Sequence, residues 1–269
     1  MTPGVITPAL IATLRRLKLG RLLATLPERL ILARQQPMPP QDFLLLVLGD
    51  EVARRDSLAV TLRATAGQLD PAMTLEQWDP TATVTSDCEL WQALVSLRFL
   101  AAHAPVVRLG PVGVGKTFLA HTLGWLASRQ GHPVLVLTAD RLLKTLTLAR
   151  RDHTDAQALR KCLTVDLLIV DDVGLDALDA TASGDTSEIL IARHRAGALI
   201  VTSNRGPDAW VATFADPLRA QSAIDRFVHN AYDLVLDAES YRKRQKPTLD
   251  TPASPQAQEG TRPQRTRRT

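Results

Sequence analysis

The chain has 269 residues, 45% of them hydrophobic and 22% charged, with a mean hydropathy of −0.03. These values are ordinary for soluble proteins and exclude collagen-like, mucin-like and wholly disordered chains. The net charge of +4 is compatible with nucleic-acid binding but does not require it. Apolar runs are far shorter than the roughly 18 residues of a spanning helix, so we expect a cytoplasmic protein without a membrane anchor.

The N-terminal third is predicted to be an all-helical arm, residues 1–69. Leucine and isoleucine recur at helical spacing over 10–21 and 22–34, and a third helix is expected over 41–66. Residues 70–85 contain two prolines and no sustained periodicity, which predicts an extended linker.

From residue 86 to about residue 240 the pattern predicts an α/β core. A helix is expected from Ser86, and short apolar runs then alternate with helical ones. The predicted strands are 105–109, 134–137, 167–170, 198–201 and 232–236. Strands that alternate with helices indicate a parallel sheet covered on both faces.

Two basic segments are candidates for binding double-stranded DNA. One lies in the arm, and the other lies in the tail, residues 241–269, which has too little apolar surface to fold alone and is expected to be disordered. Clustered cations bind phosphates whatever the base sequence. The alternative for each segment is a solvated, passive surface. The candidate residues are Arg15, Arg16, Lys18, Arg21, Arg242, Lys243 and Arg244.

The run Gly110-Pro111-Val112-Gly113-Val114-Gly115-Lys116-Thr117 matches the phosphate-loop pattern G-x-x-x-x-G-K-[ST]. A predicted strand precedes it and a predicted helix, 118–128, follows. Glycines let the backbone wrap the phosphates, Lys116 reaches the β and γ phosphates, and the Thr117 hydroxyl can bind Mg²⁺. The run predicts a site for ATP and Mg²⁺, with Phe118 among the residues that contact the nucleotide.

An acidic strand follows about 50 residues later, at Asp166-Leu167-Leu168-Ile169-Val170-Asp171-Asp172. Acids at the carboxyl end of a buried strand stand where open α/β sheets bind ligands. We expect Asp171 to be the carboxylate on the Mg²⁺ side, and Asp172 to orient or deprotonate the attacking water. An ordinary turn or helix cap is the alternative for the acidic pair.

A third buried strand ends in polar residues, Thr202-Ser203-Asn204-Arg205. If this strand lies between the phosphate-loop strand and the acidic strand, Asn204 is placed beside the γ-phosphate. A neutral amide there can position water without repelling the phosphate. A strand-end turn is the alternative interpretation.

Together these residues resemble the IstB/DnaC-like branch of the AAA+ ATPases, and most of all the IstB-type ATP-binding proteins that insertion sequences encode beside their transposase. The resemblance runs from about Pro8 to Gln245, and the arm before Trp78 is similar to the family's. The matching motifs are the phosphate loop with Thr117-Phe118-Leu119-Ala120, residues 166–172, residues 202–205 with Trp210, Asp216-Pro217, residues 223–227 and Glu239-Ser240-Tyr241-Arg242.

The resemblance implies a P-loop NTPase with a three-layer core, and an ATP-dependent transposition helper that oligomerises on DNA, marks a target and stimulates its transposase. Asn204 falls at the sensor I position. Arg226 falls where a neighbouring subunit's arginine finger is expected, which implies ATP sites at subunit interfaces; a surface ion pair is the alternative for Arg226.

Two other functions remain open from the sequence. A DnaC-like replicative helicase loader would share the ATPase core but differ in its arm, and the Leu- and Arg-rich arm here favours the transposition helper. A nucleotide-dependent binding module that scarcely hydrolyses ATP is the third hypothesis.

Overall fold

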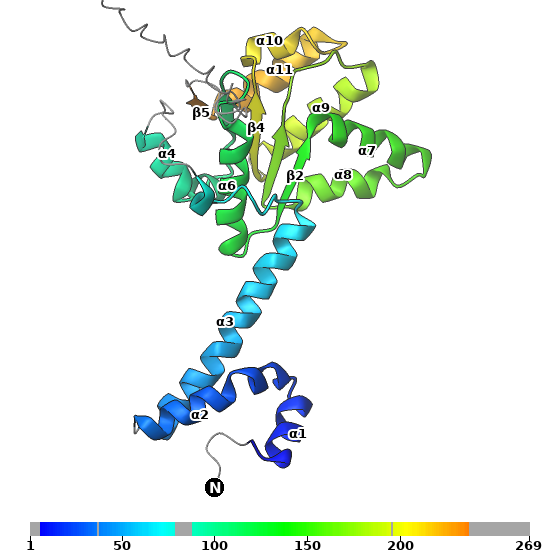
Figure 1. Cartoon of the computed structure of the whole chain (residues 1–269). Coiled ribbons are helices and arrows are strands. Elements are labelled where there is room, and N and C mark those ends of the chain that lie inside the picture. Colours follow the sequence, from blue (N-terminus) through cyan, green and yellow to red (C-terminus); the bar gives the residue numbers. More distant parts are fainter. Residues whose placement is uncertain (1–5, 37, 79–87, 195, 237–269) are drawn as a thin grey trace, which may run out of the picture.

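The computed structural model describes residues 6–36, 38–78, 88–194 and 196–236, which form a helical arm and an α/β core (Figure 1). The tail candidates Arg242, Lys243 and Arg244, and Ser86 at the predicted helix start, lie outside the described residues. Within the described ranges, no helix combines the length and apolar character needed to cross a membrane.

The arm consists of α1 (Pro8–Arg16), the 3-10 helix η1 (Gly20–Ala24), α2 (Leu26–Gln35) and α3 (Pro40–Ala66). The prediction that the first helix continues to residue 21 was wrong, because the chain turns at Lys18, which has a φ of 58°. This turn brings Leu22 and Leu26 against Val47 of α3, and all three side chains are buried. The free energy gained by burying these leucines exceeds the free energy that a longer α1 would contribute.

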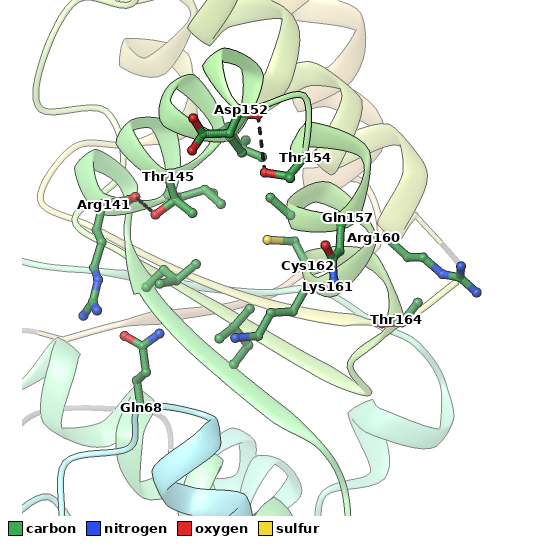
Figure 2. Close-up of a pocket in the computed structure, with 16 residues that line it drawn as sticks. Gln68, Arg141, Thr145, Asp152, Thr154, Gln157, Arg160, Lys161, Cys162 and Thr164 are labelled. Carbon is green, nitrogen blue, oxygen red and sulfur yellow. Dashed lines mark hydrogen bonds between the residues drawn. The ribbon is translucent and has the colours of Figure 1, made fainter.

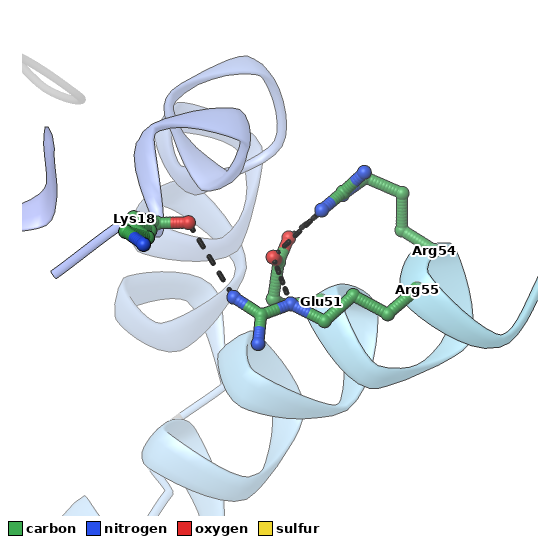
Figure 3. A network of polar contacts seen from close by, with 4 residues as sticks. All are labelled: Lys18, Glu51, Arg54 and Arg55. Atoms are coloured by element: carbon green, nitrogen blue, oxygen red, sulfur yellow. Dashed lines mark hydrogen bonds and ion pairs between the residues drawn. The ribbon is translucent and has the colours of Figure 1, made fainter. Parts of the chain in front are cut away.

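A carboxylate and two arginines join the turn at Lys18 to α3 (Figure 3). Glu51 is 3% exposed, and its carboxylate accepts hydrogen bonds from Arg54 Nε at 2.8 Å and Arg55 Nε at 2.7 Å. Arg55 also donates to the Lys18 carbonyl oxygen at 3.4 Å. The hydrogen bonds from Arg54 and Arg55 lower the pKa of Glu51 to about 2. Glu51 is therefore ionised, and Arg55 links its carboxylate to the turn at Lys18.

Helix α3 extends from the arm to the core, where its C-terminal end is embedded (Figure 1). Ala64 and Leu69 belong to the main hydrophobic cluster, and Arg63 Nε donates to the Ser128 carbonyl oxygen at 3.1 Å. The Gly67 carbonyl accepts from the Val136 amide at 2.8 Å. A Cβ atom on Gly67 would lie 2.4 Å from the Val134 carbonyl oxygen, so only glycine permits this approach of helix and strand.

The core contains a parallel sheet in the order β2-β3-β4-β1-β5. Its strands confirm the five predicted ones: β1 (Val106–Leu109), β2 (Val134–Thr138), β3 (Leu167–Asp171), β4 (Ala198–Ser203) and β5 (Tyr232–Val235). The predicted P-loop α/β fold is confirmed. Strand β4 lies between β1 and β3, which is the position that the interpretation of Asn204 required.

Helices cover both faces of the sheet. Successive residues of a strand point to opposite faces, so β1, β2, β3 and β4 each contribute side chains to both hydrophobic clusters. One face packs with the end of α3 and with α4 (Cys88–Val95), α5 (Arg98–Ala101) and α6 (Lys116–Arg129). The other face packs with α7 (Ala139–Arg151), α8 (Asp155–Thr164), α9 (Ala180–Arg193), α10 (Pro207–Val211) and α11 (Pro217–Val228). Burial of both faces explains why the central strands read as continuous apolar runs.

A buried arginine joins the amino-terminal ends of two central strands. Arg193 is 2% exposed, and its guanidinium donates to the backbone carbonyl oxygens of Cys162, Val165, Asp166 and Ala198. These bonds tie α9 to the segment before β3 and to the first residue of β4.

Candidate nucleotide site

The predicted phosphate loop connects β1 to α6 at the carboxyl edge of the sheet. Gly115 precedes α6 with a φ of 94°, a conformation that favours glycine. Lys116 is 7% exposed, and its Nζ donates to the carbonyl oxygens of Gly110 at 2.8 Å and Pro111 at 2.9 Å. The loop therefore combines the N-terminus of a helix with an ammonium group held at the loop, an arrangement suited to anions.

The two predicted metal-binding residues lie in contact. Thr117 Oγ1 donates to Asp171 Oδ2 at 2.9 Å and lies 3.1 Å from Oδ1. Asp171 ends β3 and is 6% exposed, while Thr117 lies in the first turn of α6. A hydroxyl and a carboxylate are oxygen donors of the kind that Mg²⁺ prefers, so the two side chains fit this ion.

Thr202 of β4 positions both acids, and it was not among the predicted site residues. Its hydroxyl donates to Asp171 Oδ1 and accepts from the Asp172 amide at 3.0 Å. Asp172 has a φ of 59°, in the left-handed region, and its side chain is exposed. Because Thr202 is fully buried, its hydroxyl is committed to these two contacts. The signal in the sequence was a hydroxyl near the end of the strand beside the acidic strand.

Asn204 follows directly after β4 and is exposed at the same edge of the sheet. In the register of the sheet Ser203 pairs with Leu109, so Asn204 stands next in line beside Gly110. Ser203 Oγ donates to the Val173 carbonyl at 2.6 Å and accepts from Trp210 Nε1 at 3.0 Å. These bonds fix the segments that follow β3 and β4.

An aromatic surface beside the phosphate loop pairs the predicted residue Phe118 with Trp78, which was not among the predicted site residues. The rings of Trp78 and Phe118 lie 5.4 Å apart between centroids, at an interplanar angle of 56°. A Cβ atom at Gly115 would lie 3.6 and 3.7 Å from two ring atoms of Trp78. Both side chains are half-buried. A tryptophan in an otherwise polar segment was the available signal.

Residues 70–78, the described part of the predicted linker, lie along α6 and place Trp78. Trp125 Nε1 donates to the Asp70 carbonyl at 2.8 Å, and the Asp70 amide donates to His121 Nδ1 at 3.1 Å. Arg129 pairs with Glu76 at 2.5 Å. His121 therefore accepts as a neutral ring, and burial lowers its pKa.

Arg226 and the basic residues of the arm do not contact the phosphate loop of the same chain. Arg226 is exposed on α11, whose buried face is formed by Ala223, Ile224 and Phe227 together with Ala220. The arm candidates Arg15, Arg16, Lys18 and Arg21 are exposed too. Both groups are accessible to another molecule.

Comparisons with known proteins identify relatives over most of the chain. The family model described as IstB-like ATP binding protein matches residues 12–248. An insertion-sequence ATP-binding protein of Mycobacterium tuberculosis is 34% identical over 92% of this chain and 99% of its own length. The ATP-binding protein of insertion sequence IS21 from Pseudomonas aeruginosa is 31% identical over 87% of this chain and 88% of its own.

Solved structures agree on the fold. The DnaC helicase loader has a TM-score of 0.51 at 18% identity, covering 62% of this chain and 98% of that chain. AMPPCP-bound DnaA from Aquifex aeolicus has a TM-score of 0.51 at 23% identity, covering 63% of this chain and 52% of that chain, so the match spans about half of DnaA. The chain belongs to the family of IstB-like ATP binding proteins, and it is an ATPase with the AAA+ fold.

Proposed function

We propose that the chain hydrolyses ATP with Mg²⁺ at the carboxyl edge of the sheet. The contact of Thr117 with Asp171, oriented by Thr202, carries this proposal because it unites the phosphate-loop helix and the acidic strand. When bound, Mg²⁺ would supply charge neutralisation at the phosphates. Lys116 binds the β and γ phosphates, and the Trp78–Phe118 surface lies where it can stack on the base.

Asp172 and Asn204 act on the attacking water in this proposal. The Thr202 hydroxyl fixes the Asp172 backbone, and the exposed Asp172 carboxylate accepts a proton from the water. Asn204 directly follows β4, the strand beside β1, and orients the same water through its amide. Two polar groups from neighbouring strands thus converge on one edge.

At the level of the assembly, we propose that ATP-loaded chains oligomerise on double-stranded DNA in the cytoplasm. Arg226 of one subunit completes the site of its neighbour, and its exposure on α11 supports this role. The arm, residues 1–69, and the tail, residues 241–269, contribute cations to DNA. The assembly assists a partner transposase, which the insertion-sequence relatives support. They favour this function over helicase loading, since the likeness to DnaC concerns the fold alone.

ATP turnover with and without duplex DNA tests the proposal. The wild type is compared with Lys116→Ala, and the assembly is sized in the same samples. We expect DNA-stimulated turnover that the substitution abolishes, together with an ATP-dependent large assembly. Assembly without turnover would instead indicate a nucleotide-gated DNA-binding scaffold, and turnover that survives Lys116→Ala would refute the site.

A further inference from the structure

A hollow of about 780 Å³ lies at the β2 edge of the sheet, between α7, α8 and the end of α3 (Figure 2). It lies on the face opposite α6, so it is separate from the nucleotide site. Its size is within the range of ligand-binding clefts. The floor is apolar and formed by Leu135, Leu137, Leu142, Leu146, Ala149, Ala158 and Cys162.

The charged residues that line this groove are predominantly basic. Arg141 and Lys161 stand on α7 and α8 with exposed side chains, Arg160 adds a third cation, and Asp152 is the one carboxylate among the lining residues. Among the described residues, none of the three cations forms an ion pair, whereas Lys144 and Arg150 of the same helix pair are matched with acids. The groove therefore presents uncompensated positive charge beside apolar surface.

A buried hydrogen-bond acceptor adds to this chemistry. Gln68 Oε1 is buried and has no hydrogen-bond partner within the described residues, and Figure 2 shows the amide directed toward the hollow. Leaving such a buried atom unpaired is unfavourable. An occupant with an N–H group relieves that cost. Peptide backbones carry such donors, whereas DNA phosphates do not.

We propose that this groove binds a short acidic segment of the partner transposase, with apolar side chains on the leucine floor and carboxylates at Arg141, Arg160 and Lys161. The inference rests on the proposed function, because it assigns a docking surface for that partner. Duplex DNA satisfies the cations but not the leucines or the buried acceptor, so the observations favour a peptide.

The groove connects the two parts of the chain. Gln68 directly follows Gly67, whose carbonyl accepts from Val136 of β2, and α7 and α8 pack on the same edge of the sheet. An occupant thus contacts the sheet edge and the end of the helix that carries the arm. The occupant does not cover the phosphate loop, so the chain can bind ATP and the partner segment at the same time.

The test uses fluorescein-labelled, overlapping peptides that tile the proposed partner transposase, titrated with the full chain and read by anisotropy. The groove variant is Arg141→Glu with Lys161→Glu, both at exposed positions. The matched control is Arg151→Glu, an exposed residue of α7 that does not line the groove. Binding of full-length transposase, DNA affinity and ATP turnover are measured on the same preparations.

We expect a peptide of negative net charge with large apolar residues to bind, to weaken by about tenfold or more in the groove variant, and to be unaffected by the control. If the transposase binds but no peptide has a Kd below about 100 µM, the groove proposal fails and the proposed function stands. It also fails if the groove variant binds the peptide normally, or loses only duplex DNA. If the transposase does not bind at all, the proposed function fails as well.

Discussion

Thr202→Val removes the hydroxyl that contacts both acids while keeping the side chain's size. Thr202 is fully buried, donates to Asp171 Oδ1 and accepts from the Asp172 amide at 3.0 Å. The substitution removes the hydroxyl that accepts from the Asp172 amide and the donor to the Asp171 carboxylate. Loss of the bond to the amide costs about 0.5 to 1.5 kcal/mol, and loss of the bond to the charged carboxylate costs about 1.5 to 3 kcal/mol. We expect the free energy of unfolding to fall by about 2 to 4.5 kcal/mol in total.

Catalysis should fall further than stability requires. Asp171 and Asp172 lose their common anchor, so we expect kcat to drop about 10- to 100-fold and the Mg²⁺ concentration for half-maximal turnover to rise. Steady-state ATPase assays across Mg²⁺ concentrations measure both values, below the unfolding transition of the variant.

Two controls separate the role at the site from general destabilisation. Thr202→Ser keeps the hydroxyl and should restore most of the activity. Thr186→Val removes a hydroxyl of α9 that donates to the Ala182 carbonyl at 2.8 Å, away from the acids, and should leave the Mg²⁺ dependence unchanged. A Thr202→Val protein with wild-type turnover and Mg²⁺ dependence would refute this reasoning.

Three further predictions follow from other parts of the chain. Arg193→Met removes the bonds to four backbone carbonyls and should lower the unfolding free energy by about 3 kcal/mol, measured by urea denaturation; an unchanged midpoint would contradict the role of Arg193. Glu51 is ionised in the folded arm with a pKa of about 2 against 4.5 ordinarily, so its stabilisation is present above pH 4.5 and is lost as pH falls toward 2. Glu51→Gln should remove this part of the pH dependence of thermal unfolding, and an identical profile in the variant would exclude it. Trp78→Ala should weaken ATP binding about tenfold by loss of stacking while Trp78→Phe retains most of it, and equal affinity in equilibrium titration would exclude Trp78 from the site.

The sheet and the phosphate-binding edge could be predicted because parallel strands bury both faces. Their apolar runs stand out, and polar residues at strand ends fall at one edge. The interpretation of Asn204 depended on a strand order that the sequence did not establish, and the structure supplies it by placing β4 between β3 and β1.

Features that depend on tertiary contacts could not be predicted. The turn at Lys18 follows from packing of Leu22 and Leu26 on Val47, because local periodicity alone continues the helix. Trp78 is positioned by backbone and side-chain bonds to α6 that have no local pattern. The groove at α7 and α8 likewise exists only because two helices and the end of α3 meet at the β2 edge.

The central claim, that the chain hydrolyses ATP at a site completed by a neighbouring subunit, is tested most directly by mixing two inactive variants on duplex DNA. Lys116→Ala lacks the phosphate-binding ammonium but keeps Arg226, and Arg226→Ala has the reverse defect. Each variant alone should turn over little ATP, and the mixture should recover part of the wild-type DNA-stimulated rate. A mixture as inactive as its components, or an Arg226→Ala variant with wild-type turnover, would contradict the account.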